Sequence, residues 1–175
     1  MPMNESRREP MTDMRISVEQ QPASADVRFI RSRLRAFNEE RVGPDEHRRL
    51  TILARDHEGR IQAGLIGGTY WRWLYIEALW VASEHRGKGL GGKILQAAEE
   101  EAVTRGCRFV HLDAHSFQAV DFYRRRGYVQ GGELKNLPAG QSRFLLWKPL
   151  AGHRPSTTEG IPGDEPWADR RPTIT

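Results

Sequence analysis

The sequence contains little of what marks secreted or membrane-spanning proteins. Its 175 residues include a single cysteine, Cys107, so no disulfide can form within the chain, which fits a reducing compartment. No run of about 18 apolar residues occurs, and we expect no transmembrane helix. The N-terminal stretch MPMNESRREPMTDM lacks the apolar segment of a secretory signal. Together these absences predict a cytoplasmic protein without a membrane partner.

Apolar residues are also scarce. They make up 38% of the chain against 29% charged residues, which is below the apolar share of a typical globular domain. A deficit of this kind predicts polar tails around a core of ordinary size. We therefore expect a disordered N-terminal tail over 1–13, one compact domain over 14–150, and a Pro/Gly-rich tail over 151–175 in which Trp167 is the one large anchor.

The excess of positive charge is small and spread along the chain. Lysine and arginine number 27 against 23 aspartates and glutamates, which gives a formal net charge of +4. Nucleic-acid-binding domains usually gather such charge on one face or beside a recognisable motif. No zinc-finger or RNA-binding signature is present, so the sequence argues against nucleic acid and leaves a small phosphorylated ligand as the anionic partner.

Apolar periodicity predicts one helix followed by three strands in the first half of the chain. A helix begins near Ser24, carries apolar residues at helical spacing, and ends at Gly43-Pro44. Strands over 50–55 and 61–70, joined by the turn 56–59, form an antiparallel hairpin. A third strand over 74–82 is apolar on both faces, so we expect it to be central and buried.

The second half predicts a β-α-β crossover. A helix with an apolar stripe follows the third strand from Leu90 and ends at Gly106. The strand over 108–113 should then run parallel to the third strand. A short helix over 117–126 and closing strands over 128–131 and 143–148 complete an α+β fold (mixed α/β). We expect a mostly antiparallel central sheet with one βαβ crossover and helices on both faces.

A glycine-rich and cationic loop joins the third strand to its helix, with the sequence His85-Arg86-Gly87-Lys88-Gly89-Leu90-Gly91-Gly92-Lys93. Glycines let the backbone approach a ligand closely, and free N–H groups at a helix start attract an anion. Arg86, Lys88 and Lys93 add positive charge. The loop therefore predicts a bound pyrophosphate or polyphosphate.

Three phosphate-binding patterns match this loop to different degrees. Gly87, Gly89 and Gly92 satisfy the dinucleotide pattern GxGxxG, and Asp113 lies where a ribose-binding acid should be, but too few residues follow for a doubly wound domain. The nucleotide-hydrolase pattern GxxxxGK[ST] fails at Ile94, which has no hydroxyl for magnesium. The third pattern is Arg86-x-x-Gly89-x-Gly91 after an apolar strand.

The third pattern resembles the R/Q-x-x-G-x-G/A motif of the GNAT family of N-acetyltransferases. The run AVDFYRRRGY over 119–128 looks like the family's A-x-x-F-Y-x-x-x-G-[FY] motif, and the resemblance covers about 27–150. It implies that acetyl-CoA (coenzyme A) is the acyl donor. Ser116 stands where the family often has asparagine. The residues that would bind the cofactor are Leu79, Trp80, Val81, Arg86, Gly87, Lys88, Gly89, Leu90, Gly91, Gly92, Ser116, Ala119 and Tyr123.

The resemblance also implies catalytic roles. In the family the tyrosine of the FY pair protonates the departing thiolate, which makes Tyr123 the candidate general acid; a phenol with a pKa near 10 can protonate a thiolate whose acid has a pKa near 8.5. Glu77 is the candidate base, acting through a water, because it is the only charged residue in an otherwise apolar strand and such surroundings raise a carboxyl pKa. The family has a bulge in this strand, and backbone N–H groups near Leu79 to Val81 would hold the carbonyl oxygen and the pantetheine arm.

Two further groups of residues have simpler interpretations. His111, Asp113 and His115 alternate along one strand, and we interpret them as polar residues at its open end, because no further ligand nearby completes a metal site; we expect no metal. The aromatic residues flanking the central strand indicate packing, although some could line an acceptor pocket. They are Tyr70, Trp71, Trp73, Tyr75 and Trp80.

The sequence thus predicts an acetyl-CoA-dependent N-acetyltransferase that transfers an acetyl group to a primary amine by direct attack. The alternatives are an NAD(P)-binding oxidoreductase domain and a non-catalytic CoA-binding module. The acceptor would be a small-molecule or peptide amine, and no motif indicates which. Members of the family often form dimers, so a homodimer is also an expectation from the resemblance.

Overall fold

The computed structural model describes residues 14–150. The predicted tails over 1–13 and 151–175, with Trp167, lie outside these residues. The chain divides into two compact units between Pro44 and Asp45. No helix within the described range is long and apolar enough to cross a membrane.

The first unit contains helix α1 (Ser24–Val42), which confirms the helix predicted from apolar periodicity. The carbonyl of Ala23 accepts the N–H groups of Asp26 and Val27, so Ala23 is the cap residue and Ser24 is the first helical residue. Gly43 ends the helix with φ of 80°, a conformation that favours glycine. Its N–H donates to the carbonyl of Glu39.

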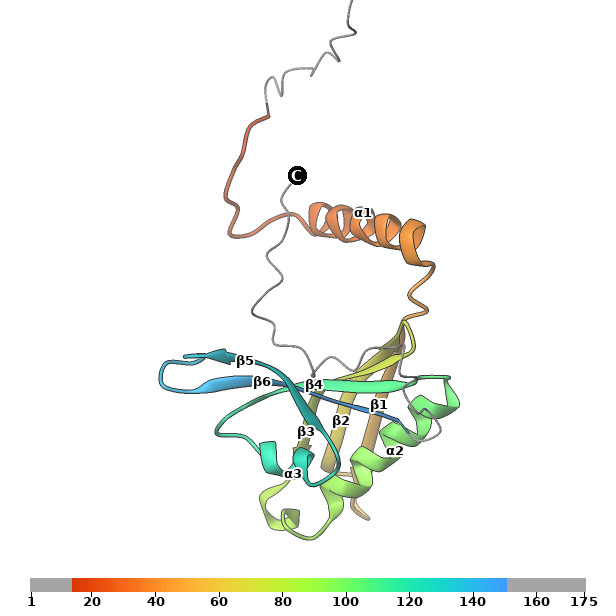
Figure 1. The fold of residues 1–175 in the computed structure, drawn as a ribbon, viewed down its shortest axis with the longest axis vertical. Helices are drawn as coiled ribbons and strands as arrows, with labels where there is room; N and C mark the ends of the chain where they lie inside the picture. The colour runs from red at the N-terminus through yellow and green to blue at the C-terminus, as the bar shows by residue number, and fades with distance from the viewer. Residues whose placement is uncertain (1–13, 151–175) are drawn as a thin grey trace, which may run out of the picture. The chain divides into compact units, whose positions relative to one another are not determined.

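The second unit is built on a six-stranded sheet in the order β1-β2-β3-β4-β6-β5 (Figure 1). Only β3 and β4 pair in parallel, and the other neighbours are antiparallel. The predicted antiparallel sheet with one crossover is therefore confirmed, and the doubly wound dinucleotide domain is excluded. The strands are β1 (Arg48–Arg55), β2 (Ile61–Tyr70), β3 (Trp73–Val81), β4 (Phe109–His115), β5 (Val129–Lys135) and β6 (Ser142–Pro149).

Two helices and one short 3-10 turn join these strands. Helix α2 (Leu90–Thr104) connects β3 to β4 after the turn η1 (Ser83–His85), and Gly106 ends it with φ of 80°. Helix α3 (Val120–Arg124) is shorter than the predicted helix over 117–126. The reason is a turn before it, in which the carbonyl of His115 accepts the N–H of Gln118 while the Gln118 side chain accepts the N–H of His115.

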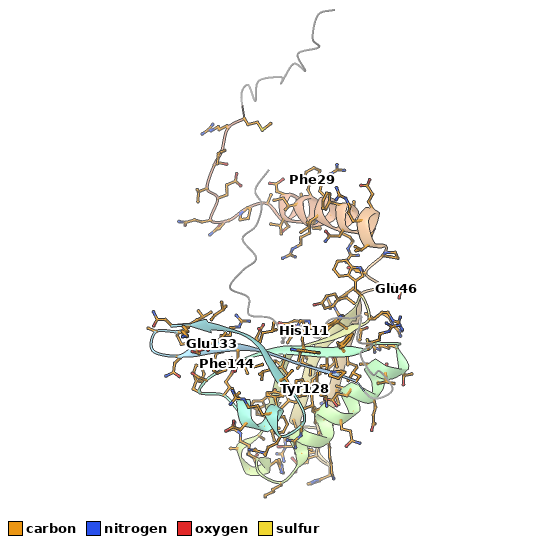
Figure 2. The ribbon with its side chains drawn as sticks, in the orientation of Figure 1. Phe29, Glu46, His111, Tyr128, Glu133 and Phe144 are labelled. Carbon is orange, nitrogen blue, oxygen red and sulfur yellow. The ribbon has the colours of Figure 1, made fainter. Side chains whose placement is uncertain are left out.

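The core lies between the sheet and α2 and α3. Both helices contribute buried side chains to it, among them Ile94 and Leu95 of α2 and Val120 of α3. Each such side chain stabilises the fold by about 1.5–3 kcal/mol relative to an exposed one. Tyr128 lies on this side of the sheet and His111 on the opposite side (Figure 2). Cys107 is also buried, and burial raises the pKa of its thiol.

Strand β3 is central, as predicted, but it is not buried on both faces. Leu74 and Ile76 point into the core, whereas Trp73 and Tyr75 on the other face are half-buried and Trp80 is 51% exposed. The prediction from the apolar run therefore overestimated the burial of this strand. Alternation along β3 places half of its side chains away from the face that α2 covers.

The aromatic face of β3 packs against its neighbours in the sheet. The Tyr75 ring stacks on the imidazole of His111 with ring centres 5.0 Å apart, and Trp73 stacks on Phe109 at 4.6 Å. Tyr70 Oη lies 2.8 Å from His111 Nε2, within hydrogen-bond distance. Burial lowers the pKa of His111, although the nearby Asp113 opposes this shift. Trp73 also contacts the His111 ring edge-on with ring centres 5.7 Å apart, so three of the predicted aromatic residues pack around one histidine.

Candidate active site

A break in strand pairing opens a cleft between β3 and β4. The two strands pair from Trp73 with Phe109 as far as Ile76 with Leu112, and no further. On the other side of β3, Gly67 pairs with Ile76 and Ile66 pairs with Ala78, so Glu77 is an extra residue. Such a bulge bends the strand away from its neighbour. The bulge expected from the family resemblance is present, and the β3 edge facing β4 is open beyond Ile76.

Gly67 makes this bulge sterically acceptable. A Cβ atom on Gly67 would collide with the backbone carbonyl oxygen of Tyr75. Only a residue without a side chain allows the two backbones to approach so closely. The position of Glu77 at the edge of the cleft therefore depends on a glycine in the neighbouring strand.

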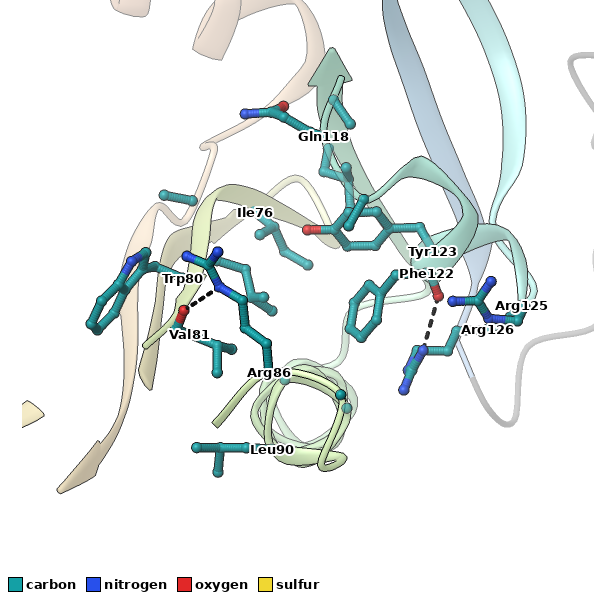
Figure 3. A pocket seen from close by; sticks show the side chains of 18 of the residues that line it. Ile76, Trp80, Val81, Arg86, Leu90, Gln118, Phe122, Tyr123, Arg125 and Arg126 are labelled. Atoms are coloured by element: carbon teal, nitrogen blue, oxygen red, sulfur yellow. Dashed lines mark hydrogen bonds between the residues drawn. The ribbon is translucent and has the colours of Figure 1, made fainter. Parts of the chain in front are cut away.

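A pocket of about 780 Å³ occupies the space between the separated strands and the start of α2 (Figure 3). Its volume is in the range of small-molecule and cofactor sites. The structure brings most of the predicted site residues to its wall. They are Glu77, Leu79, Trp80, Val81, Arg86, Gly87, Gly89, Leu90, Gly91, Gly92, Ala119 and Tyr123.

Two of the predicted cofactor-binding residues do not line this pocket. Lys88 is exposed on the loop and is not part of the wall. Ser116 instead holds the start of β6, because its Oγ accepts the N–H of Ser142 at 3.1 Å and donates to the side chain of Gln141. Their roles in binding remain predictions from the family resemblance.

The glycine-rich loop presents its backbone N–H groups to the pocket. Gly87 and Gly89 have φ of 71° and 85°, and Gly89 is the cap residue of α2. None of the backbone N–H groups from Gly87 to Gly92 donates a hydrogen bond to an acceptor within the described residues. Arg86 follows η1, and its Nε donates to the carbonyl of Val81, the last residue of β3, at 3.0 Å. Free N–H groups, the positive end of the helix dipole and a guanidinium are together suited to binding an anion.

Tyr123 places a buried hydroxyl in the same pocket. Its side chain is 8% exposed, and its ring packs edge-on against Phe122 and Tyr128 with centres 5.0 and 5.5 Å apart. The hydroxyl points into the pocket (Figure 3), and nothing in the described part of the chain hydrogen-bonds to it. Burial raises the pKa of this phenol above its usual value of 10.0. Tyr123 therefore stays protonated at neutral pH and is free to donate its proton.

Glu77 lies at the bulge with its side chain exposed, so the apolar surroundings expected for its carboxylate are absent. The expectation failed because burial was inferred from neighbours along the strand, while the cleft leaves this position open to solvent. Glu77 nevertheless lines the same pocket as Tyr123. Within the described residues no cation forms an ion pair with its carboxylate.

The polar residues at the open end of β4 have partners of their own. Asp113 forms an ion pair with Arg143 at 2.8 Å, so its carboxylate is not a free ribose-binding acid. His115 stacks on Phe117 with ring centres 5.2 Å apart. Residues 14–150 contain no cluster of three or more His, Cys, Asp or Glu side chains that could hold a metal ion.

The sequence reasoning missed part of the pocket wall. Phe122, Arg125 and Arg126 line it, although Phe122 had counted only as a letter of the A-x-x-F-Y-x-x-x-G-[FY] motif and the two arginines only as spacing within it. Helical spacing could have indicated two of them, because residues three and four apart share one helix face. Phe122 and Arg126 have that spacing.

Comparison with known proteins places this pocket in a defined context. Residues 14–128 match the model of the acetyltransferase (GNAT) family. An acetyltransferase of Agrobacterium fabrum is 39% identical over 68% of this chain and 87% of its own length. A blasticidin-S acetyltransferase of Streptomyces morookaense is 37% identical over 53% of this chain and 68% of its own length. A crystal structure of an acetyltransferase from Agrobacterium tumefaciens has a TM-score of 0.73 with 34% identity, covering 78% of this chain and all of that one.

Proposed function

The chain belongs to the GNAT family of acetyltransferases, and we propose that it transfers the acetyl group of acetyl-CoA to a primary amine by direct attack. Members of the family act on small-molecule or peptide amines. The single observation that carries the proposed mechanism is the Tyr123 hydroxyl, which is buried, unpartnered and directed into the pocket.

The pocket has the features that the acyl donor requires. CoA carries a pyrophosphate, and the free N–H groups from Gly87 to Gly92, with the Arg86 guanidinium beside them, match that anion. The open edge of β3 offers backbone groups to the amides of the pantetheine arm, as in strand addition. An arm bound along this edge would extend from the loop towards Tyr123 and place the thioester near its hydroxyl.

Tyr123 is the proposed general acid. When the amine nitrogen bonds to the thioester carbonyl carbon and the carbon–sulfur bond breaks, the sulfur leaves as a thiolate that requires a proton. A phenol that burial keeps protonated can supply this proton. Backbone N–H groups on the open edge of β3, near Leu79 to Val81, would stabilise negative charge on the carbonyl oxygen.

Glu77 is the proposed general base. An ammonium ion has no lone pair for attack, so the acceptor must lose a proton before or during the reaction. Glu77 lines the pocket at the bulge, exposed and without an ion pair in the described chain, and it can take that proton through a water molecule. The proton leaves the amine at one wall of the cleft, and Tyr123 donates another to sulfur at the opposite wall.

The test is release of free thiol from acetyl-CoA in the presence of an amine panel. The panel contains blasticidin S, the compound named for one relative, together with an aminoglycoside, spermidine, lysine and a peptide with a free N-terminus. We expect acetylation of at least one amine, seen as thiol release and a mass increase of one acetyl group. Binding of acetyl-CoA without turnover on a wide panel would favour a non-catalytic module, and binding of NADH instead of acetyl-CoA would refute the proposal.

A further inference from the structure

Two arginines lie on the pocket wall away from Arg86. Arg125 and Arg126 follow helix α3, and both line the pocket. In Figure 3 they lie beside Phe122, on the side of α2 opposite to Arg86. We propose that Arg126, assisted by Arg125, binds the 3′-phosphate of CoA and makes the enzyme discriminate CoA from dephospho-CoA. This inference rests on the proposed function, because it requires CoA in this pocket.

Two contacts with Phe122 hold the Arg126 guanidinium in place, and Gly92 leaves room for it. Its Nη1 donates to the carbonyl of Phe122 at 3.0 Å, and its central carbon lies 3.8 Å from the centre of the Phe122 ring. A Cβ atom on Gly92 would approach Nη2 to 2.6 Å. The guanidinium thus packs against the first turn of α2, where the glycine leaves room for it. Because it is already ordered, little side-chain entropy would be lost when it binds an anion.

The second observation is that this cation has no counter-charge. Arg124, one residue before the pair, forms an ion pair with Asp121 at 3.2 Å. By contrast, no carboxylate in residues 14–150 forms an ion pair with Arg125 or Arg126. A half-buried and ordered guanidinium with free N–H groups is a site for a phosphate, which it can bind with paired hydrogen bonds.

The order of groups along CoA decides which phosphate reaches these arginines. The thioester must lie near Tyr123, and the pantetheine arm would follow the open edge of β3. The pyrophosphate would then meet the loop at Arg86 and the start of α2. Beyond it the nucleotide would extend past the start of α2 towards Arg125 and Arg126, which line the same pocket, and its remaining anionic group is the 3′-phosphate. CoA and dephospho-CoA differ in that group alone, so the pair offers a direct test.

The experiment measures the dissociation constants of CoA and dephospho-CoA by calorimetry, using the full chain. The wild type should bind CoA about 10- to 100-fold more tightly, the effect of hydrogen bonds to a charged group. Arg126→Gln should lower the CoA affinity by about that factor and leave dephospho-CoA within about twofold. Arg124→Gln, at an arginine outside the pocket, is the matched control and should change neither affinity.

Several outcomes would overturn the inference. Equal affinity of the wild type for CoA and dephospho-CoA would refute the inference. An equal loss of affinity for both ligands in Arg126→Gln would also refute it. Should that variant unfold, the exposed Arg125→Gln and the charge-preserving Arg126→Lys replace it. The first should reduce the preference for CoA, and the second should keep only part of it, because an ammonium group cannot form the paired hydrogen bonds of a guanidinium. Binding of neither ligand by the wild type would instead refute the proposed function, so the two failures are distinguishable.

Discussion

Replacing Tyr123 by phenylalanine removes the proposed proton donor and little else. The hydroxyl has no hydrogen-bond partner in the described part of the chain, so its loss leaves no protein group unsatisfied. The ring contacts with Phe122 and Tyr128 do not involve the oxygen. Removing a buried hydroxyl that lacks a partner is close to neutral for folding. We expect the free energy of unfolding to change by less than about 0.5 kcal/mol.

The effect on the reaction should be much larger. A positioned general acid contributes about 10²- to 10⁴-fold to the rate, which corresponds to about 2.7–5.5 kcal/mol of activation free energy. The turnover number of Tyr123→Phe should therefore fall by at least about 100-fold. The dissociation constant of CoA should stay within about twofold, because the free N–H groups of the loop and Arg86 are unchanged.

Tyr128→Phe provides a matched control with the opposite expectation. The Tyr128 hydroxyl donates to Glu99 Oε1 at 2.8 Å on the side of the core, and Lys148 Nζ bonds to the other oxygen of the same carboxylate at 2.8 Å. Loss of a hydrogen bond to a charged group costs about 1.5–3 kcal/mol. This variant should be less stable than the wild type while its rate at saturating substrate stays close to normal.

The assay follows thiol release with the best amine of the panel, and urea unfolding reports stability. The reasoning would be refuted if Tyr123→Phe turned over at the wild-type rate, or if Tyr123→Phe lost stability as Tyr128→Phe is expected to do. Slow thiol release by Tyr123→Phe whose rate increases with pH would agree with loss of a proton donor. At high pH the sulfur can leave as a thiolate without being protonated by the enzyme.

Three further predictions concern other parts of the site and the sheet. Glu77→Gln should lower the rate by about 10²- to 10⁴-fold with CoA binding retained, and an unchanged rate on a good acceptor would remove Glu77 from the mechanism. Burial lowers the pKa of His111 in the folded state. As the pH falls below about 6.5, the unfolded chain therefore binds a proton before the folded chain does, and the free energy of unfolding should decrease. Urea unfolding should show lower stability at pH 5 than at pH 7, and His111→Gln should make this difference smaller. In Gly92→Ala the new methyl group should displace the Arg126 guanidinium, so calorimetry should show weaker CoA binding at nearly unchanged stability, and full retention of CoA affinity would contradict the assigned contact.

Some features of the fold could be predicted from short stretches of sequence. Helix α2 follows from its apolar stripe and from Gly106 at its end, and both features are local. The parallel pairing of β3 and β4 follows from the handedness and length of the crossover between them. The glycine-rich loop could be assigned to an anion because the chemistry of free N–H groups at a helix start depends on a few neighbouring residues.

Other features depend on residues far apart in the chain. The bulge at Glu77 requires Gly67 on the next strand, and no pattern within β3 indicates that contact. The exposure of Glu77 and Trp80 could not be read from their apolar neighbours, because it results from the separation of β3 from β4. The ordered position of Arg126 likewise depends on Gly92, which lies in α2.

The sequence by itself determined the family, the order of helices and strands, and the chemistry of the loop, since each depends on residue types at short spacing. Only the tertiary structure decided which side chains meet in the cleft, where the Tyr123 hydroxyl points, and which cations remain without a partner. The physical reason is that burial and ion pairing are set by contacts between distant segments, which a local pattern of residues does not specify.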